Sequence, residues 1–286
     1  MIYLWLSILS STGIYVLFKV RNQAKADLHG IILVNYFVAM LLGLINHNFN
    51  TFISVLQNAT WLPIAGLIGF LFVVMFFLIG NSTLKAGMVV TTLATRMSMV
   101  FPIFFSMFFF DEQVSLVRLL KIALTLLAVI LAIYQKPDKA IKRSAVFIPF
   151  ILFVGSGSVD TLVKTAQHLF VPDNEIPIFS SVLFATSFVA ALLALIVKKP
   201  QKTIFSRSSI QMGIGLGIAN WGSLFFIMKA LNYSRLDSSL VFGVNNLAIV
   251  SLSLILGYFV FSEKLSRVNI AGIILSVLSI ILLIRY

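Results

Sequence analysis

The chain has 286 residues, of which 60% are hydrophobic and only 10% are charged, and its mean hydropathy is +1.06. A soluble domain of this size would need far more charge on its surface, so we expect the excess apolar surface to face lipid. The net charge of +12 does not indicate nucleic-acid binding, because no basic segment with interleaved aromatics stands apart, and the lack of cysteine excludes thiolate metal sites and disulfides.

A transmembrane helix needs about 20 mostly apolar residues. The basic residues near the N-terminus follow its apolar segment instead of preceding it, so we interpret that segment as a retained first span and not as a signal peptide. A charge-free polar loop is expected at 47–60. In chain order, the ten predicted spans are 2–19, 29–46, 62–80, 87–110, 114–135, 145–170, 176–197, 210–231, 237–261 and 265–285.

An internal repeat divides the chain into two halves. FVAMLLGLI at 37–45 and FVAALLALI at 188–196 agree at seven of nine positions, at an offset of 151 residues. We therefore predict an all-α transmembrane fold of ten helices, built as five-helix repeats over 1–135 and 145–286 with a basic linker at 136–144. Because each half has an odd number of spans, the second half is inverted, and inverted repeats typically form a site near the bilayer midplane that permits alternating access.

Three further sequence features resemble those of a known family. Pro102 stands ten residues before Glu112, Glu112 and Glu263 each precede the last span of a half, and the eighth span ends in an Ala-Leu-Asn-Tyr-Ser stretch at 230–234. With these features the chain resembles the EamA-type branch of the drug/metabolite transporter superfamily over nearly its whole length, although Ser253 stands where a partner of Pro102 would fall. The resemblance implies a transporter or exporter of amino acids or related metabolites in a bacterial cytoplasmic membrane.

Ionisable residues inside spans are costly and usually face protein or a water-filled cavity. Ser156, Asp160 and Lys164 share one face of the sixth span because they fall at helical spacing. They could meet the charged ends of a zwitterionic solute, or Asp160 and Lys164 could form an internal ion pair. The spacing favours the pair, which would leave Asp160 ionised and the protein a facilitator or exchanger. Without the pair, Asp160 could carry a proton.

Arg96 lies about ten residues into the fourth span, and Thr95-Arg96 correspond to Asn245-Asn246 in the ninth span at an offset of 150. We expect these two pairs to face each other and Arg96 to recognise a carboxylate, although a helix-packing hydrogen-bond network is the alternative. The remaining candidate substrate-binding residues, for which packing is also an alternative, are Ser11, Tyr15, Asn35, Asn220 and Trp221.

Other motifs point to structure. Glu112 and Glu263 at helix starts would complement the helix dipole, and Gly213-x-Gly215-x-Gly217 inside an apolar span would let helices approach closely. The histidines at 29, 47 and 168 have no metal-ligand spacing, so we expect neither a metal nor a cofactor.

The repeat and the polar spans favour a transporter that is not an enzyme. Its expected partners are a small-molecule substrate and the lipid bilayer, without nucleic acid, and it would be a monomer or homodimer. The alternative is an integral-membrane enzyme acting on a lipid or isoprenoid substrate, which would need a cluster of acid, base or metal-binding groups. A membrane sensor or subunit of a complex is a third possibility.

The distribution of basic residues conflicts with the resemblance on orientation. Loops after odd-numbered spans contain 14 Lys and Arg residues, whereas the even-side loops and the C-terminus contain 5. Because basic loops stay in the cytoplasm, this count places both termini outside. The family resemblance implies that both termini are cytoplasmic.

Overall fold

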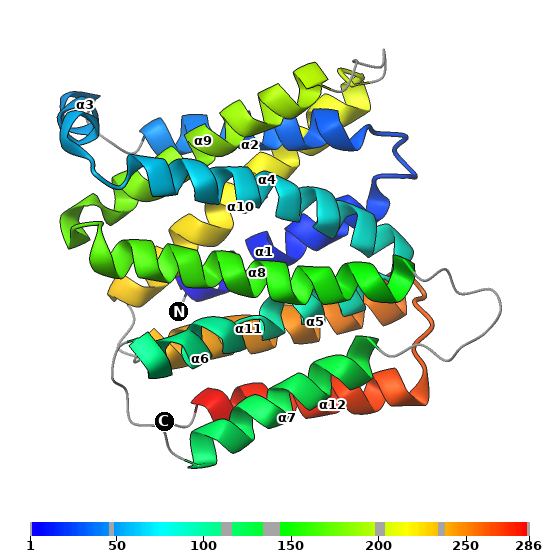
Figure 1. Ribbon diagram of the computed structural model, residues 1–286. Helices are drawn as coiled ribbons and strands as arrows, with labels where there is room; N and C mark the ends of the chain where they lie inside the picture. Colours follow the sequence, from blue (N-terminus) through cyan, green and yellow to red (C-terminus); the bar gives the residue numbers. More distant parts are fainter. Residues whose placement is uncertain are drawn as a thin grey trace. The chain divides into compact units, whose positions relative to one another are not determined.

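The computed structural model describes residues 2–45, 49–109, 116–133, 144–197, 204–233 and 238–284. Within these ranges all regular structure is helical (Figure 1). The α-helices are α1 (Ile2–Val20), α2 (Leu28–Ile45), α3 (Phe49–Asn58), α4 (Leu62–Lys85), α5 (Met88–Met97), α6 (Val100–Phe109), α7 (Leu116–Ile133), α8 (Ser144–Leu169), α9 (Ile176–Val197), α10 (Arg207–Tyr233), α11 (Ser238–Ile255) and α12 (Arg267–Ile284), with a 3-10 turn η1 (Asp173–Glu175) and a π-helix η2 (Leu256–Val260).

Six of these helices are long and apolar enough to cross a membrane, judged by length and composition among the described residues. They are α1, α2, α4, α8, α9 and α10. Each of the ten apolar segments expected from the sequence contains a helix. Glu112, His47 and residues 136–143 of the expected linker lie outside the described residues.

Two expectations about local structure were wrong. The segment 47–60 contains the helix α3 instead of a loop. The predicted span 87–110 is broken at Ser98-Met99 into α5 and α6. Pro102 explains the break, because it has no N–H to donate to the Ser98 carbonyl four residues earlier and its ring crowds that carbonyl. The Ser98 carbonyl instead accepts a hydrogen bond from the Phe101 N–H at 2.9 Å.

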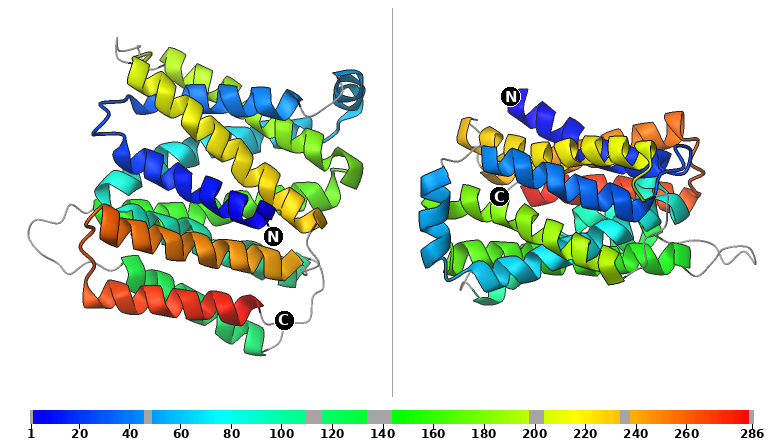
Figure 2. Two further views of the ribbon diagram at one scale, coloured as in Figure 1. Left: turned by 180° about the vertical axis from the view of Figure 1, so that it is seen from behind. Right: turned by 90° about the horizontal axis from the view of Figure 1, so that it is seen from above.

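The chain forms two units, each of which combines segments from both halves of the sequence. Unit 1 comprises Met1–Lys19, Leu78–Asp160 and Ser223–Tyr286. In unit 1, α12 packs along α7, and α11 packs against both α5 and α12. Figure 1 and the left view of Figure 2 both show α7 and α12 side by side. Unit 1 therefore pairs helices that occupy matching places in the two sequence halves.

Unit 2 comprises Val20–Phe77 and Thr161–Gly222, and in it α2 packs along α9. Glycines bring α10 against α2: a Cβ at Gly213 would lie 2.6 Å from the Val34 Cβ, and one at Gly217 would lie 2.7 Å from the Asn35 carbonyl oxygen. Side chains larger than hydrogen would therefore force these helices apart. The predicted role of these two glycines in close helix packing is confirmed.

Candidate functional site

The short helix α5 carries Arg96, and its start requires a glycine. Gly87 precedes the first residue of α5 and has φ +99°, a conformation that side chains larger than hydrogen rarely adopt. A Cβ at Gly87 would also lie 2.9 Å from Oε2 of Glu263. The sequence therefore stops α4 at Lys85 and lets a new helix begin at Met88.

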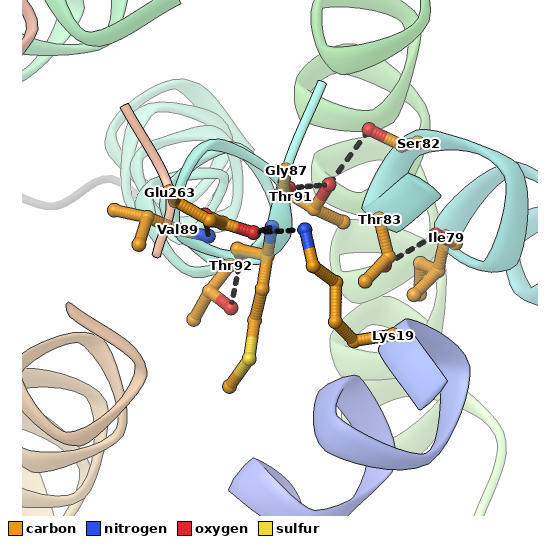
Figure 3. Close-up of polar contacts among 10 residues, drawn as sticks. Lys19, Ile79, Ser82, Thr83, Gly87, Val89, Thr91, Thr92 and Glu263 are labelled. Carbon is orange, nitrogen blue, oxygen red and sulfur yellow. Dashed lines mark hydrogen bonds and ion pairs between the residues drawn. The ribbon is translucent and has the colours of Figure 1, made fainter. Parts of the chain in front are cut away.

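The carboxylate of Glu263 holds the N-terminus of α5 (Figure 3). It accepts hydrogen bonds from the backbone N–H groups of Met88 at 2.6 Å and Val89 at 3.1 Å. The Lys19 ammonium at the end of α1 forms an ion pair with the same carboxylate and lies 5.9 Å from the centre of the Phe261 ring. A negative charge at a helix start is stabilised by the helix dipole, and here a cation stabilises it as well.

The Glu263 side chain is 8% exposed, so its charge needs these partners. The sequence predicted Glu263 at the start of its own helix, α12, but the carboxylate instead caps α5, which begins 175 residues earlier. Sequence reasoning missed Lys19 and this cap. The only available signals were Gly87 at the break and the position of Glu263 before the last span.

Around Arg96, polar side chains from three helices of unit 1 meet. The Tyr15 hydroxyl of α1 is hydrogen-bonded to the Thr95 hydroxyl at 2.6 Å. The Arg96 guanidinium lies 6.0 Å from the centre of the Tyr15 ring, at the outer limit of a cation–π contact. Its Nη1 donates to Oδ1 of Asn246 on α11 at 3.5 Å. The predicted meeting of Thr95-Arg96 with the Asn246 region is confirmed.

Asp160 of α8 comes to the break between α5 and α6. Ser98 donates its hydroxyl to the Thr95 carbonyl at 2.6 Å and also lies 3.3 Å from Oδ2 of Asp160. Since one hydroxyl has one hydrogen, the contact with Asp160 is the weaker of the two. The positive charge of Arg96 acts on the Asp160 carboxylate. Ser98 was not among the predicted site residues, since a serine near the end of a helix is common.

Aromatic packing explains how α8 reaches this break. Phe101 of α6 and Phe153 of α8 stack edge to face with ring centres 5.1 Å apart. A Cβ at Gly157 would lie 2.3 Å from the Phe101 ring, so only glycine lets α8 approach α6 this closely. Asp160 follows Gly157 by about one helical turn, which places its carboxylate near Ser98.

Two buried polar atoms in this cluster have no hydrogen-bond partner. They are Nε of Arg96 and Oδ1 of Asn245, whose residue is 5% exposed. Nearly all buried polar groups in proteins are hydrogen-bonded to protein or water, so this donor on α5 and this acceptor on α11 are groups that a polar ligand would satisfy. Asn246 itself also donates to the Met99 sulfur at 3.4 Å.

The expected ion pair between Asp160 and Lys164 is not formed. The two residues lie one turn apart on α8 and the Lys164 side chain is exposed. The ion pairs among the described residues join Lys19 to Glu263 and, when the histidine is protonated, His29 to Asp27. The contact with Ser98 turns the carboxylate toward α5, so the alternative based on a local pair is set aside.

The other candidate residues divide between the units. Ser11 is buried in α1 and Ser156 is half-buried on α8, both in unit 1. Asn35 and Asn220 lie in unit 2, where their side-chain amides are hydrogen-bonded at 3.3 Å, and the half-buried Trp221 follows on α10. The contact between Asn35 and Asn220 joins α2 to α10, as the packing interpretation predicts.

These features define an all-helical protein with several helices long enough and apolar enough to cross a membrane, and with charged and amide side chains gathered where α1, α5, α8 and α11 meet in unit 1. No family model matches the chain. The chain is 26% identical over 286 residues to an uncharacterized protein of Haemophilus influenzae, and the alignment covers 96% of this chain and 94% of that protein. The two proteins are thus similar along almost their whole length.

Proposed function

We propose that this protein is a multi-pass transporter of a cell membrane, which exports small metabolites such as amino acids or related solutes by alternating access. The observation that carries the proposal is the Arg96 guanidinium, which lies among apolar helices with its Nε unsatisfied. A fixed positive charge in such a place needs an anionic partner, and a solute carboxylate supplies two acceptor oxygens.

The packing of repeat-related helices supports a carrier built from two inverted halves. In unit 1, α12 begins 151 residues after α7, and α11 begins 150 residues after α5; the members of each pair pack together. In unit 2, α2 packs against α9, the helices that contain the FVAMLLGLI and FVAALLALI matches. These are the offsets of the sequence repeat, and contacts between equivalent elements are expected beside a pseudo-twofold axis.

Helix breaks support the same proposal. Discontinuous helices in transporters place half-helix ends beside the bound solute or ion. Here α5 is a ten-residue segment with breaks at both ends. Arg96 lies near its C-terminal end and contacts Asn246 of α11, and Ser98 just beyond that end contacts Asp160 of α8. Together with the sequence features at 102, 112 and 263, this favours membership of the EamA-type branch of the drug/metabolite transporter superfamily.

Asp160 is the acid of this site, and we assign it the exchange of a proton during transport. Arg96 cannot do this because arginine does not deprotonate in proteins. The contact of Asp160 with Ser98, in place of a pair with Lys164, keeps the carboxylate near enough to Arg96 for the two charges to interact. Proton exchange there would link solute movement to a pH gradient.

The deciding experiment measures solute flux into liposomes that contain the purified protein. Amino acids, nucleotides and organic cations are compared as separate classes, with protein-free liposomes as the blank. We expect saturable flux of at least one solute that has a carboxylate. Flux restricted to cations, or no flux with any class, would contradict the proposal.

Arg96→Gln tests the binding role directly. Charge-assisted hydrogen bonds contribute about 1.5–3 kcal/mol, so flux of a carboxylate solute should fall about 10- to 100-fold. The matched control is Lys85→Gln, which removes an exposed positive charge at the end of α4 in the same unit. Native flux in Arg96→Gln, with both variants folded in detergent, would exclude Arg96 from the site.

Asp160→Asn tests the coupling role. Asparagine keeps the size of the side chain and can still accept a hydrogen bond from Ser98. Its amide group cannot take up or release a proton near neutral pH. We expect the variant to retain flux and to lose its dependence on an imposed pH gradient. A gradient dependence equal to that of the native protein would place the exchanged proton elsewhere or exclude coupling.

A further inference from the structure

A second charged group is buried without a hydrogen bond, in the turn between α1 and α2 of unit 2. Arg21 is 9% exposed, and its guanidinium makes no hydrogen bond or ion pair with any described residue. Its Nε is completely buried. A buried polar donor is costly unless it has an acceptor, so the Arg21 guanidinium has hydrogen-bonding capacity for a group from outside the described residues.

The charge of Arg21 lies at a junction of two helix N-termini. Asp27 caps α2, because its Oδ1 accepts the N–H groups of His29 at 2.8 Å and Gly30 at 3.1 Å. The Asp27 N–H donates to the Ser209 hydroxyl in the first turn of α10 at 2.8 Å. The Arg21 guanidinium is near enough to interact electrostatically with Asp27, so it lies at the same junction.

Close backbone packing fixes this junction. A Cβ at Gly30 would lie 2.0 Å from the carbonyl oxygen of Ile204, the residue that precedes α10 by three positions. The Ser206 hydroxyl in turn accepts the Ser209 N–H at 3.2 Å and so caps α10. Two N-terminal helix turns, each with a partial positive charge, are therefore held against each other beside Arg21.

Asp27 offsets only part of this positive charge. Burial lowers the pKa of the Arg21 guanidinium and the Asp27 charge opposes that shift, so the group stays charged at neutral pH. The Asp27 oxygen that faces α2 is occupied by backbone N–H groups and does not bind Arg21. The junction keeps an excess of positive charge and a donor group without an acceptor.

We propose that Arg21 and the adjoining N-terminal turns of α2 and α10 bind a phosphate group, supplied by the headgroup of an anionic phospholipid. Arginine and helix N-termini are the groups that proteins use for phosphate. The junction directly follows α1, a helix long enough to cross a membrane, and it belongs to the odd-side loops that contain 14 of the basic residues. Clustered basic residues beside a span bind anionic lipid headgroups. This site does not depend on the transport function.

The test uses the full chain in detergent and three probes: phosphatidylglycerol, phosphatidylcholine and inorganic phosphate. Lipid retention is measured by native mass spectrometry, and the thermal unfolding midpoint is measured with each probe. The variants are Arg21→Gln and, as a matched control, Arg267→Gln, which removes an exposed arginine from the first turn of α12, outside the proposed site. Arg21→Lys keeps the charge and provides a folded comparison if Arg21→Gln does not fold.

We expect phosphatidylglycerol to be retained and to raise the unfolding midpoint more than phosphatidylcholine does. Arg21→Gln should weaken this binding about tenfold, Arg21→Lys should weaken it less, and Arg267→Gln should leave it almost unchanged. Equal retention of both lipids by the native protein, or equal phosphatidylglycerol binding by native protein and Arg21→Gln, would overturn the proposal. Stabilisation by inorganic phosphate that phosphatidylglycerol does not reproduce would overturn the proposal that a lipid headgroup supplies the phosphate.

Discussion

The hydroxyls of α9 in unit 2 and the cluster around Arg96 in unit 1 satisfy their polar atoms in different ways. In unit 2, hydroxyls along α9 donate to carbonyls of their own helix, as Ser180 does to Ile176 at 3.0 Å and Ser187 does to Leu183 at 2.7 Å. In unit 1, Arg96 and Asn245 keep buried atoms without a partner. A hydroxyl can be satisfied within one helix, whereas a guanidinium needs a partner from outside it. On the proposed function, the α9 hydroxyls hold helices together, whereas Arg96 and Asn245 would bind a solute.

The lengths of uninterrupted helices also differ between the two units. α9 of unit 2 runs for 22 residues without a break, whereas α5 and α6 of unit 1 run for ten residues each. An unbroken helix satisfies its backbone internally, and each break exposes N–H and C=O groups that need other partners. Unit 1 meets this need with Glu263 at one end of α5 and Ser98 at the other. If the comparison is correct, substitutions in unit 2 should affect stability, and those in unit 1 should affect transport as well.

The largest effect is expected from Gly30→Ala in unit 2. The added methyl group would overlap the Ile204 carbonyl, which belongs to the backbone and cannot turn away. We expect a loss of about 1–3 kcal/mol in the free energy of unfolding, seen as a lower thermal unfolding midpoint. Gly66→Ala is the control, since no atom lies within 4 Å of a Cβ there, and alanine should be neutral or stabilising by up to about 1 kcal/mol. Equal midpoints for the two variants would show that close packing does not hold unit 2.

The next effect compares one carboxylate in each unit. Glu263→Gln removes the charge that pairs with Lys19 and faces the start of α5, and it should cost about 1–3 kcal/mol of unfolding free energy. Glu175→Gln keeps an acceptor for the Trp61 indole N–H, which Oε2 binds at 2.9 Å, and should cost less than about 1 kcal/mol. Lys19→Met in the Glu263→Gln background should add little, because the pair is already lost. Additive losses would show that the two charges act independently.

The smallest effect is expected from Tyr15→Phe, which separates a role in transport from a role in helix packing. Tyr15→Phe removes the hydrogen bond to Thr95 beside Arg96, and solute flux in liposomes should fall about 3- to 10-fold with little change in the unfolding midpoint. Ser187→Ala removes a hydroxyl that binds only backbone carbonyls of α9 and α4, and should leave flux unchanged. A lower flux in Ser187→Ala than in Tyr15→Phe would reverse the roles assigned to the two units.

Helix positions could be predicted from apolar length because each helix must bury or cover its own hydrophobic side chains. The contact between Arg96 and Asn246 could also be predicted, since the repeat offset relates their helices. The break at Ser98-Met99 was missed because the fourth predicted span remains apolar on both sides, and the proline that causes the break stands four residues later. The cap by Glu263 was missed because it joins segments 175 residues apart, which no local pattern encodes.

The geometry of α5 has a mechanical consequence. A ten-residue helix is about 15 Å long, and Arg96 stands about 12 Å from the end that Glu263 holds. Neither end continues into another helix, so any movement of α5 during transport would turn about its anchored end. A tilt of about 5° would carry the Arg96 backbone about 1 Å, on the scale of the 3.5 Å contact with Asn246. The Lys19–Glu263 ion pair would then fix the end about which α5 turns. Weakening this ion pair would shift the Arg96 guanidinium without changing any residue that contacts the guanidinium.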